Sequence, residues 1–332
     1  MTLLSNKDAV RDFLAGPLGL DSAGARIEFL AGGVSSTVVR VVVGGDCFVI
    51  KQALPQLRAD EPWFSRPERS GIEARCAEVL TGLVPGSVLP VGRIVPEACA
   101  FTMACAPDGS DTWKADLMRG DVRPEISRAA GELLGNVHAR SASVPDLATA
   151  FADRSFFTEL RVEPYLLHAA NRHPDLAGEL GWLADKLLDP GICLVHGDFS
   201  PKNLLVTPAS GLLLLDHEVA HWGQPAFDLA FVLSHLCLKG IHLRSVACVD
   251  AAADVVDAYR RASTVADAAT GTLGARTLAG LLLARVDGKS RVGYLTEEQD
   301  EMVRILAAGL LRGRVTDLDG VLDTVRAGVA RA

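Results

Sequence analysis

The sequence predicts an α+β fold with two lobes: a small N-terminal lobe built on an antiparallel β-sheet and a larger, mostly helical C-terminal lobe. Two observations predict this fold. Short runs of β-branched residues, separated by glycine-rich turns, are concentrated in the first part of the chain. From about residue 124 the pattern becomes mostly helical, with one hairpin as the exception. We therefore expect lobes at residues 1–105 and 106–332, with a hinge near Ala104–Gly109.

The N-terminal lobe begins with three predicted strands. Their residues are 26–30, 37–43 and 46–51. The pair Gly44-Gly45 between the second and third strands indicates a tight hairpin turn. We expect a helix over about 66–82, and then a further pair of strands near 88–94 and 99–104.

The C-terminal lobe contains one predicted hairpin among its helices. A strand-like run, Ile192–Val195, leads into a loop, and two short strands follow within 203–215 around the turn Pro208–Gly211. No apolar run approaches the roughly 18–20 residues that a membrane-spanning helix needs. Charged residues also interrupt the apolar residues at the N-terminus, which argues against a secretory signal. We therefore expect no membrane association.

Cysteine usage and charge narrow the class of protein further. The chain has seven cysteines without a Cys-x-x-Cys pair, and several lie in apolar segments. This pattern favours buried free thiols in a reducing compartment, so we expect a cytoplasmic protein. The net charge of −8 is spread along the chain without a basic stripe, which argues against nucleic-acid binding. We expect a monomer or homodimer.

The stretch 194–222 gives the strongest indication of chemistry. His196-Gly197-Asp198 follows the strand-like run, and Asn203 lies on the same tight loop, where Pro201 turns both side chains toward one point. A carboxylate in such a loop can orient an attacking hydroxyl, and an amide oxygen can bind a metal ion. The alternative is a polar turn whose Asp and Asn only cap backbone groups.

Two acidic residues follow the hairpin. Asp216 ends the strand-like run Gly211–Leu215, and Glu218 points the same way if the backbone stays extended. Solvated acids at the end of a strand are the alternative. Phosphoryl transfer from a metal–nucleotide complex needs one carboxylate for the acceptor hydroxyl and oxygen ligands for Mg²⁺. We therefore expect Asp198 as the catalytic residue, with Asn203, Asp216 and Glu218 as metal ligands.

Lys51 ends the third predicted strand and is a candidate for binding nucleotide phosphates. Such a lysine needs an acidic partner, and the predicted helix offers Glu68, Glu73 and Glu78. Glu73 shares a helical face with the apolar Ala77 and Leu80, so it projects toward the interior. We therefore expect Glu73 to hold Lys51; an unpaired, solvated lysine is the alternative.

The loop Gly32–Ser36 lies between the first two predicted strands. Backbone amides and the hydroxyls of Ser35 and Ser36, beside Gly33, could cover phosphates, although glycine pairs are also common in plain hairpins. No Gly-x-Gly-x-x-Gly opens a helix, so the loop is not a dinucleotide-binding fingerprint.

Two motifs in the chain imitate other sites. His217-Glu218-Val219-Ala220-His221 matches the zinc-protease pattern, but that pattern requires a helix, whereas this segment follows directly on a strand and ends at Gly223 and Pro225. Gly288-Lys289-Ser290 imitates the end of a phosphate-binding P-loop. The first glycine of a P-loop is missing there, because Leu283 takes its position, and the preceding residues look helical. We reject both interpretations.

These residues together resemble the aminoglycoside phosphotransferase/choline kinase superfamily, which shares the protein-kinase-like fold. The residues that carry the resemblance are Lys51, Glu73, His196-Gly197-Asp198 with Asn203, and Asp216-x-Glu218. The segment Trp222–Ala230 also resembles the family's stretch after the metal-binding acids, which implies that Asp228 braces the catalytic loop.

The N-terminal part shows a second likeness. Lys51–Pro55 followed by Trp63 is similar to the methylthioribose kinase branch of the superfamily, whereas Asp198–Asn203 is closer to the general phosphotransferase pattern. The resemblance covers roughly residues 25–295. It implies transfer of the γ-phosphate of ATP, with Mg²⁺, to a hydroxyl of a small molecule.

The resemblance also implies where ATP and the acceptor bind. Adenine is expected at the hinge, beside Met103 and Cys105. Acceptor contacts are expected from five residues: Asp111, Trp222, Arg285, Asp287 and Lys289.

The acceptor is expected to be a sugar or a nucleoside-derived compound, or else an aminoglycoside or other antibiotic. A polycationic acceptor would need several acids, for which Asp111, Asp287 and Glu297 are the candidates. A non-catalytic nucleotide-binding pseudokinase is the alternative of another class.

Overall fold

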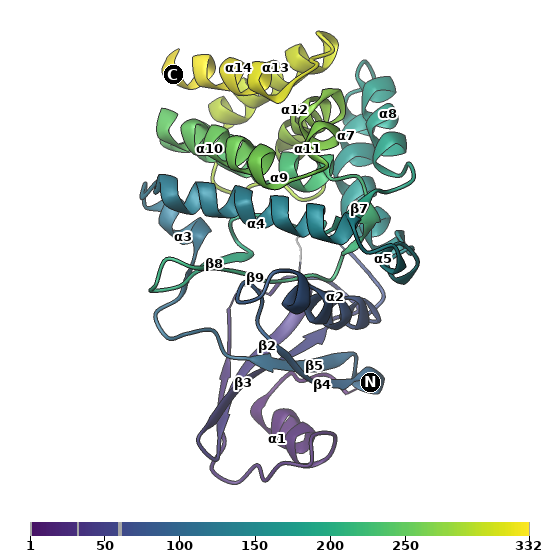
Figure 1. Ribbon diagram of the computed structural model, residues 1–332, viewed down its shortest axis with the longest axis vertical. Coiled ribbons are helices and arrows are strands. Elements are labelled where there is room, and N and C mark those ends of the chain that lie inside the picture. The colour runs from purple at the N-terminus through teal and green to yellow at the C-terminus, as the bar shows by residue number, and fades with distance from the viewer. Residues whose placement is uncertain (1, 32, 59–61, 332) are drawn as a thin grey trace. The chain divides into compact units, whose positions relative to one another are not determined.

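The structure is a computed structural model that describes residues 2–31, 33–58 and 62–331. The chain divides into two compact units, drawn in Figure 1. Unit 1 consists of Met1–Asp108 together with Asp216–Val219, and unit 2 consists of Gly109–Leu215 together with Ala220–Ala332. This division lies three residues beyond the expected lobe boundary. It also assigns the short segment that carries Asp216 and Glu218 to unit 1.

Unit 1 is built on a five-stranded antiparallel sheet with the strand order β1-β2-β3-β5-β4. The strands are β1 (Arg26–Phe29), β2 (Ser36–Val43), β3 (Asp46–Ala53), β4 (Val91–Val95) and β5 (Ala100–Ala104). All five expected strands are thereby confirmed. Gly44 and Gly45 have φ of 60° and 93°, as a tight turn between β2 and β3 requires.

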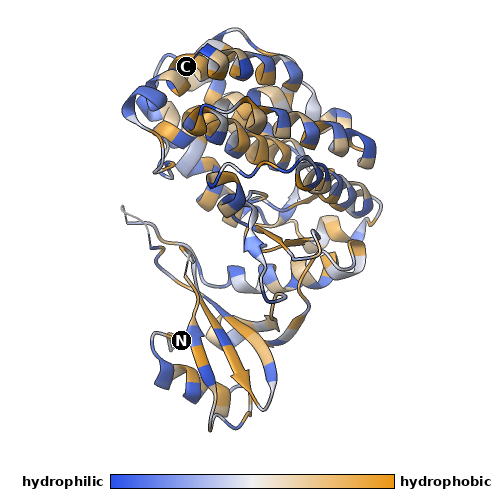
Figure 2. Cartoon of the chain, turned by 90° about the vertical axis from the view of Figure 1, so that its left-hand side faces the viewer, coloured by the Kyte–Doolittle hydropathy of each residue, from blue (hydrophilic) through white to orange (hydrophobic). Residues whose placement is uncertain are grey.

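Two helices pack on this sheet. They are α1 (Lys7–Ala15) and α2 (Arg69–Leu83), and a short 3₁₀ turn, η1 (Pro96–Ala98), joins β4 to β5. Val39, Val41 and Ile50 form one hydrophobic core with the buried face of α1. Because side chains alternate along a strand, Lys51 points to the opposite side from Ile50, toward α2. In Figure 2 the strands of this sheet are mainly hydrophobic, with short hydrophilic bands.

Unit 2 is mostly helical, and the predicted α+β class is confirmed. Its longer helices are α4 (Pro124–Ala142), α8 (Ala177–Leu187), α9 (Ala226–Leu243), α10 (Val246–Ala262), α12 (Thr272–Asp287), α13 (Glu297–Arg312) and α14 (Leu318–Arg331). Its shorter helices are α3 (Trp113–Met118), α5 (Asp146–Ala150), α6 (Ser155–Phe157), the π-helical segment η2 (Thr158–Leu167), α7 (His168–Arg172) and α11 (Ala266–Thr270).

Unit 2 also contains short antiparallel strands. They are β6 (Asp111–Thr112), β7 (Cys193–Val195), β8 (Leu204–Val206), β9 (Leu212–Leu214) and β10 (His221–Gly223). Strand β8 pairs with both β6 and β9, and β7 pairs with β10. The β8–β9 hairpin confirms the one expected within 203–215. The loop 196–203, which the sequence predicts to be the catalytic loop, therefore lies between β7 and β8.

Helix α9 is the central helix of unit 2. Every residue from Ala226 to Ile241 is buried. It is long and apolar enough to cross a membrane by length and composition, but 89% of that window is buried inside the protein. It has the burial of a core helix.

Helices α4 and α10 pack closely, at positions where α4 has glycine. A Cβ at Gly131 would lie 2.3 Å from the carbonyl oxygen of Val255, and a Cβ at Gly135 would lie 2.7 Å from the Cβ of Ala262. Side chains do not fit there, so the two helices approach backbone to backbone. This close approach brings His138 of α4 to Tyr259 of α10, with 2.8 Å between His138 Nδ1 and the Tyr259 hydroxyl.

Candidate active site

A buried lysine on the sheet of unit 1 is held by two carboxylates. Lys51 Nζ donates to Glu73 Oε1 at 2.6 Å and also pairs with Asp216. Lys51 is 8% exposed and Glu73 is 3% exposed. Glu73, and not Glu68 or Glu78, therefore forms the ion pair with Lys51, as its position on the apolar face of α2 predicts.

The charge of Lys51 is stabilised by its surroundings. Burial by itself lowers the pKa of a lysine, but the carboxylates of Asp216, Glu73 and Glu218 outweigh that effect and hold the pKa of Lys51 above its usual value. Lys51 is thus a fixed cation on the inner side of the sheet. A fixed ammonium of this kind suits the binding of phosphate oxygens.

Glu218 is bound by a residue that the sequence did not point out. Arg69 is fully buried, and its Nε donates to Glu218 Oε2 at 2.9 Å. Its Nη2 donates to the backbone carbonyls of Ser35 and Leu54 at 2.5 Å and 2.8 Å. Arg69 thereby ties α2, the end of β3, the loop before β2 and Glu218 together within unit 1.

Three carboxylates of unit 1 lie close enough to share a cation. One oxygen each of Glu73, Asp216 and Glu218 lies within 4.8 Å of the others. Asp216 has φ of 69°, a left-handed conformation that is rare for a residue with a side chain. The local backbone therefore fixes an unusual direction for this carboxylate.

The glycine-rich loop before β2 is anchored from several sides. Gly32 lies outside the described residues. A Cβ at Gly33 would lie 2.4 Å from the carbonyl oxygen of Ser36, so only glycine fits there. Arg58 donates to the Gly33 carbonyl at 3.0 Å, and the Ser35 carbonyl accepts from Leu54 N at 2.8 Å. The Ser36 hydroxyl is buried, and no described residue hydrogen-bonds to it.

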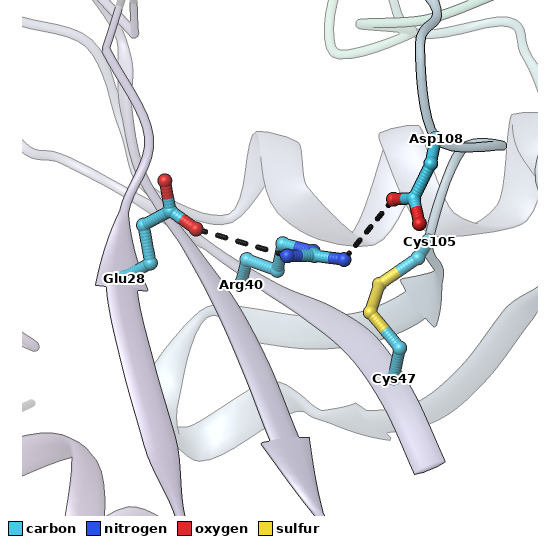
Figure 3. The surroundings of a disulfide bond; sticks show 5 residues. All are labelled: Glu28, Arg40, Cys47, Cys105 and Asp108. Atoms are coloured by element: carbon cyan, nitrogen blue, oxygen red, sulfur yellow. Dashed lines mark hydrogen bonds and ion pairs between the residues drawn. A yellow bond between two sulfur atoms is a disulfide. The ribbon is translucent and has the colours of Figure 1, made fainter. Parts of the chain in front are cut away.

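A disulfide lies at the predicted adenine-binding hinge. Cys47 and Cys105 are bonded, with their Cα atoms 5.9 Å apart (Figure 3). The expectation that all seven cysteines are free thiols is therefore wrong; five are free. The pairing of Phe48 with Ala104 across β3 and β5 brings these two cysteines together from distant positions in the sequence. Location in the cytoplasm stays a prediction.

The hinge region has further links to the sheet. Met103 lies in β5, where it pairs with Val49 of β3. Beyond the disulfide, Arg40 of β2 lies between Glu28 and Asp108, at 3.8 Å and 3.3 Å from their carboxylates (Figure 3). The segment that follows β5 is thus tied to β2 and β3 both covalently and electrostatically. Adenine binding at Met103 and Cys105 stays a prediction.

In unit 2, Asp198 lies on the catalytic loop and is almost completely buried. Its carboxylate lies 3.1 Å from Arg161 Nη2 and 2.9 Å from Lys202 Nζ, and it accepts a hydrogen bond of 2.7 Å from Asn203 Nδ2. Asn203 Nδ2 also donates to the Asp198 carbonyl at 2.9 Å. The predicted convergence of Asp198 and Asn203 is present.

Asp228 holds the backbone of this loop. It accepts hydrogen bonds from the amides of His196 and Gly197, at 2.6 Å and 2.8 Å, and lies 3.2 Å from His138 Nε2. Burial favours a raised pKa for Asp228, but the hydrogen bond from His138 and the charges and amide of its neighbours outweigh burial and lower the pKa. Asp228 therefore braces the loop as a carboxylate, as the resemblance implies, and His138 extends the brace to Tyr259.

Arg161 is the second residue that sequence reasoning missed. It lies on η2, where the wider π-helical turn is uncommon and often marks a functional position. Besides pairing with Asp198, its Nε donates to the Gly197 carbonyl at 2.7 Å. A signal in the sequence could have been Pro164, which interrupts ordinary helix geometry close to this arginine.

The oxygen of the Asn203 side chain is the atom suited to a metal. Its amide nitrogen is already used in bonds to Asp198, so Oδ1 remains as a ligand atom. The backbone carbonyl of Asn203 accepts from Leu215 N at 2.9 Å, and Asp216 follows Leu215 in the chain. Amide and carboxylate oxygens are the ligands that Mg²⁺ prefers.

Three of the predicted acceptor residues are engaged in other bonds. Asp287 is buried and accepts from Arg304 at 2.8 Å and 3.1 Å, with His173 Nε2 at 2.8 Å. The indole of Trp222 donates to the Gly191 carbonyl, and Asp111 is exposed beside Arg119. Contact of these three residues with an acceptor stays a prediction.

The two basic candidates lie at the end of α12. Arg285 donates to the Tyr165 hydroxyl at 3.0 Å and to Ser290. The backbone N–H of Lys289 donates to the Pro164 carbonyl at 2.8 Å. Both therefore contact the segment η2 that carries Arg161.

The rejection of the two imitating motifs agrees with the structure. Residues 217–221 form no helix, and His221 lies in β10, where its ring stacks on Phe157 with 4.1 Å between ring centroids. Residues Thr272–Asp287 are helical, so Gly288–Ser290 follows a helix rather than a strand. Among the described residues, no cluster of metal-binding type includes a histidine.

A cavity of about 730 Å³ lies elsewhere in unit 2, between the end of α9 and helices α13 and α14. Ile241, Met302 and Ile305 are among its lining residues. None of the residues that we associate with phosphate transfer lines it, so it plays no part in the site.

Comparisons with known proteins also indicate a phosphotransferase. The phosphotransferase enzyme family matches residues 26–273. No curated protein sequence shows significant similarity to the chain. Among solved structures, an ethanolamine kinase from Plasmodium vivax is 10% identical with a TM-score of 0.58, covering 94% of this chain and 91% of that chain.

Two further structures are similar over almost their whole length. A choline/ethanolamine kinase family protein from Mesorhizobium loti is 15% identical with a TM-score of 0.52, covering 98% of this chain and 99% of that chain. A macrolide 2′-phosphotransferase from Brachybacterium faecium is 19% identical with a TM-score of 0.52, covering 90% and 97%. At such low identities these likenesses concern the fold, whereas the family match covers most of the chain. The chain belongs to the phosphotransferase enzyme family.

Proposed function

We propose that this phosphotransferase is a kinase that moves the γ-phosphate of ATP to a hydroxyl of a small molecule. The observation that carries the proposal is the buried Lys51, held as a cation between Glu73 and Asp216. A fixed ammonium beside a cluster of carboxylates suits a metal–nucleotide complex, because phosphates and metal ions need opposite charges at short range.

Asp198 supplies the second half of the chemistry. Its carboxylate is fixed by Arg161, Lys202 and Asn203, so an acceptor hydroxyl would meet a base whose orientation is already set. Asp198 would accept the hydroxyl proton as the oxygen attacks phosphorus, and Lys202 would approach the phosphoryl oxygens. Fixed groups that need no rearrangement during the reaction lower its barrier.

Asn203 Oδ1 and Asp216 are the residues that would hold Mg²⁺, with Glu218 close to Asp216 and fixed by Arg69. The ion, when bound, neutralises charge on the phosphates. Lys51 would bind the α- and β-phosphates, Ser35 and Ser36 would lie near them, and adenine would bind at Met103 and Cys105.

Among the acceptors considered, the polycationic class has the least support. Asp287, the buried acid of its candidate residues, is already paired with Arg304 and lies at hydrogen-bond distance from His173. A sugar or nucleoside-derived acceptor is therefore our first choice, and the similarity to the methylthioribose kinase branch stays a prediction. An aminoglycoside phosphotransferase of similar fold has been solved as a complex with streptomycin and ATP. That complex is a property of that protein.

The test combines nucleotide binding with phosphate transfer. We expect Mg-ATP to stabilise the protein in a thermal-shift measurement, and Asp198→Ala to keep this stabilisation while losing at least about 100-fold in transfer, the usual contribution of a positioned base. Lys51→Met should weaken nucleotide binding itself.

Asp189→Asn is the matched control, because Asp189 is a half-buried acid paired only with Lys186 among described side chains. Transfer by Asp198→Ala at the wild-type rate would refute the role of Asp198. ATP binding without hydrolysis or transfer to any hydroxyl compound would instead indicate a pseudokinase.

A further inference from the structure

Helix α9 contains a buried ammonium, the side chain of Lys239, that forms no ion pair with any described residue. Phe231, His235 and Lys239 follow one another at successive turns of the helix. Lys239 is 1% exposed, and its Nζ donates only weakly, at 3.4 Å, to the His235 carbonyl. In the part of the chain that the structure describes, no carboxylate lies at ion-pair distance from it. Burying an ammonium without a partner is costly, and an anion bound beside it would reduce that cost.

Two other cations act electrostatically on this lysine. Arg285 of α12 is 9% exposed, and Lys114 of α3 acts with it on the Lys239 ammonium. Neither Arg285 nor Lys114 has a carboxylate at ion-pair distance among the described residues. The other groups that face Lys239 are the ring of Tyr294, 5.5 Å from Nζ, and the thiol of Cys248 on α10. Within the described parts of the chain, none of these three cations therefore forms an ion pair.

His235 adds an unused donor or acceptor to the same place. Its Nε2 is buried, and no described residue hydrogen-bonds to it. Burial and the neighbouring cations, Arg285 first, lower the pKa of His235 well below its usual value. We call His235, Lys239 and Arg285 the α9 cation cluster. A neutral imidazole with a free ring nitrogen, between two cations, suits an oxyanion.

The α9 cation cluster is connected to the proposed base. Arg161, which pairs with Asp198, lies with its Cζ 5.8 Å from the ring of Phe231, and the Phe231 ring lies 5.1 Å from that of His235. Tyr165 accepts from Arg285, and its pKa is lowered, because Arg285 and Arg161 outweigh the effect of burial. A chain of contacts therefore leads from Asp198 through Arg161 and Phe231 to His235 on α9.

We propose that the acceptor of this kinase carries an oxyanion, a carboxylate or a phosphate, that binds the α9 cation cluster while its hydroxyl lies at Asp198. This inference rests on the proposed function and adds the charge of the acceptor. Phe231, which lies beside the Arg161 that pairs with Asp198, is separated from Lys239 by about 12 Å of helix at 1.5 Å per residue. The phosphorylated hydroxyl and the oxyanion therefore lie apart on the acceptor molecule. Cationic acceptors, such as amino sugars and quaternary amines, are then excluded by repulsion from the same residues.

The experiment measures oxyanion binding directly. Sulfate, as a phosphate-like anion, and acetate, as a carboxylate, are titrated by calorimetry at constant ionic strength into the wild type and into Lys239→Met, His235→Phe and Lys51→Met. We expect saturable binding of at least one anion, weakened at least 10-fold in Lys239→Met and reduced in His235→Phe. The preference between sulfate and acetate distinguishes a phosphate from a carboxylate acceptor.

Two controls separate this site from others. Lys186→Met removes a half-buried lysine that pairs with Asp189, and this variant should bind anions like the wild type. Anion binding at the nucleotide site would be lost in Lys51→Met and kept in Lys239→Met, the opposite of our expectation. Equal anion affinity in the wild type and Lys239→Met, when circular dichroism shows that both proteins are folded, overturns the inference.

A second arm uses acceptors that share one carbon skeleton: glucose, glucuronate, glucose 6-phosphate and glucosamine. Stabilisation in the presence of Mg-ADP should favour the anionic sugars over glucose, and glucosamine should have the least effect. A preference for glucosamine would overturn the inference. If Mg-ADP does not bind to the protein, the proposed kinase function is refuted, whether or not anions bind.

Discussion

The buried lysine of α9 makes the stability of the protein depend on pH in a way that one substitution should remove. Burial and the charges of Lys114 and Arg285 lower the pKa of Lys239 from 10.5 to about 7. In the unfolded chain the same lysine keeps its proton until about pH 10.4. Between these values the unfolded state binds more protons than the folded state. The free energy of unfolding therefore rises with pH in this interval.

The magnitude follows from the two pKa values. At about 1.4 kcal/mol per pH unit, the folded state gains on the order of 4 kcal/mol between pH 7 and pH 10.5. Below pH 7 Lys239 is charged in both states, and the full cost of the buried ammonium is present. Lys239→Met keeps the length and apolar stem of the side chain and removes the charge. We expect this variant to be more stable than the wild type at pH 6, with a difference that shrinks toward pH 10.

The assay is urea unfolding, followed by circular dichroism, at several pH values between 6 and 9.5 in buffers without sulfate or phosphate. Comparing wild type and variant isolates Lys239, because His235, Tyr294 and Cys248 are present in both proteins. Lys186→Met should show no such pH-dependent difference from the wild type. A difference that does not change with pH, or a variant that is less stable at pH 6, would refute the reasoning.

Two further predictions concern the catalytic loop and the hinge. Asp228→Asn removes the carboxylate charge that accepts hydrogen bonds from the amides of His196 and Gly197. We expect a loss of about 2–3 kcal/mol in the free energy of unfolding, together with slower turnover. Unchanged stability in urea would contradict the role of Asp228 in holding the loop. The Cys47–Cys105 disulfide closes a long loop, so Cys105→Ser, or reduction of the wild type, should cost about 2–4 kcal/mol. Thiol titration of the unfolded, unreduced chain should find five thiols, and seven would contradict the disulfide.

Several parts of the fold and site could be predicted because their signals are local. Strand and helix periodicity indicated the sheet of unit 1, and Gly44-Gly45 marked its hairpin because glycine alone adopts such turns without cost. The order His196-Gly197-Asp198 with Asn203 indicated a loop in which a carboxylate and an amide meet. The helical face of Glu73 was sufficient to choose it as the partner of Lys51.

Only the tertiary structure decided the contacts between distant segments. Arg69 and Glu218 are separated by 149 residues, and nothing in the residues around Arg69 distinguishes it from other arginines until the fold buries it. The same holds for Cys47 and Cys105, which the register of β3 and β5 brings together, and for Asp287, whose charge Arg304 neutralises. The sequence by itself indicated phosphate transfer, because the candidate groups for this reaction lie in short motifs. The tertiary structure decided which buried charges have partners, because partners depend on packing between elements.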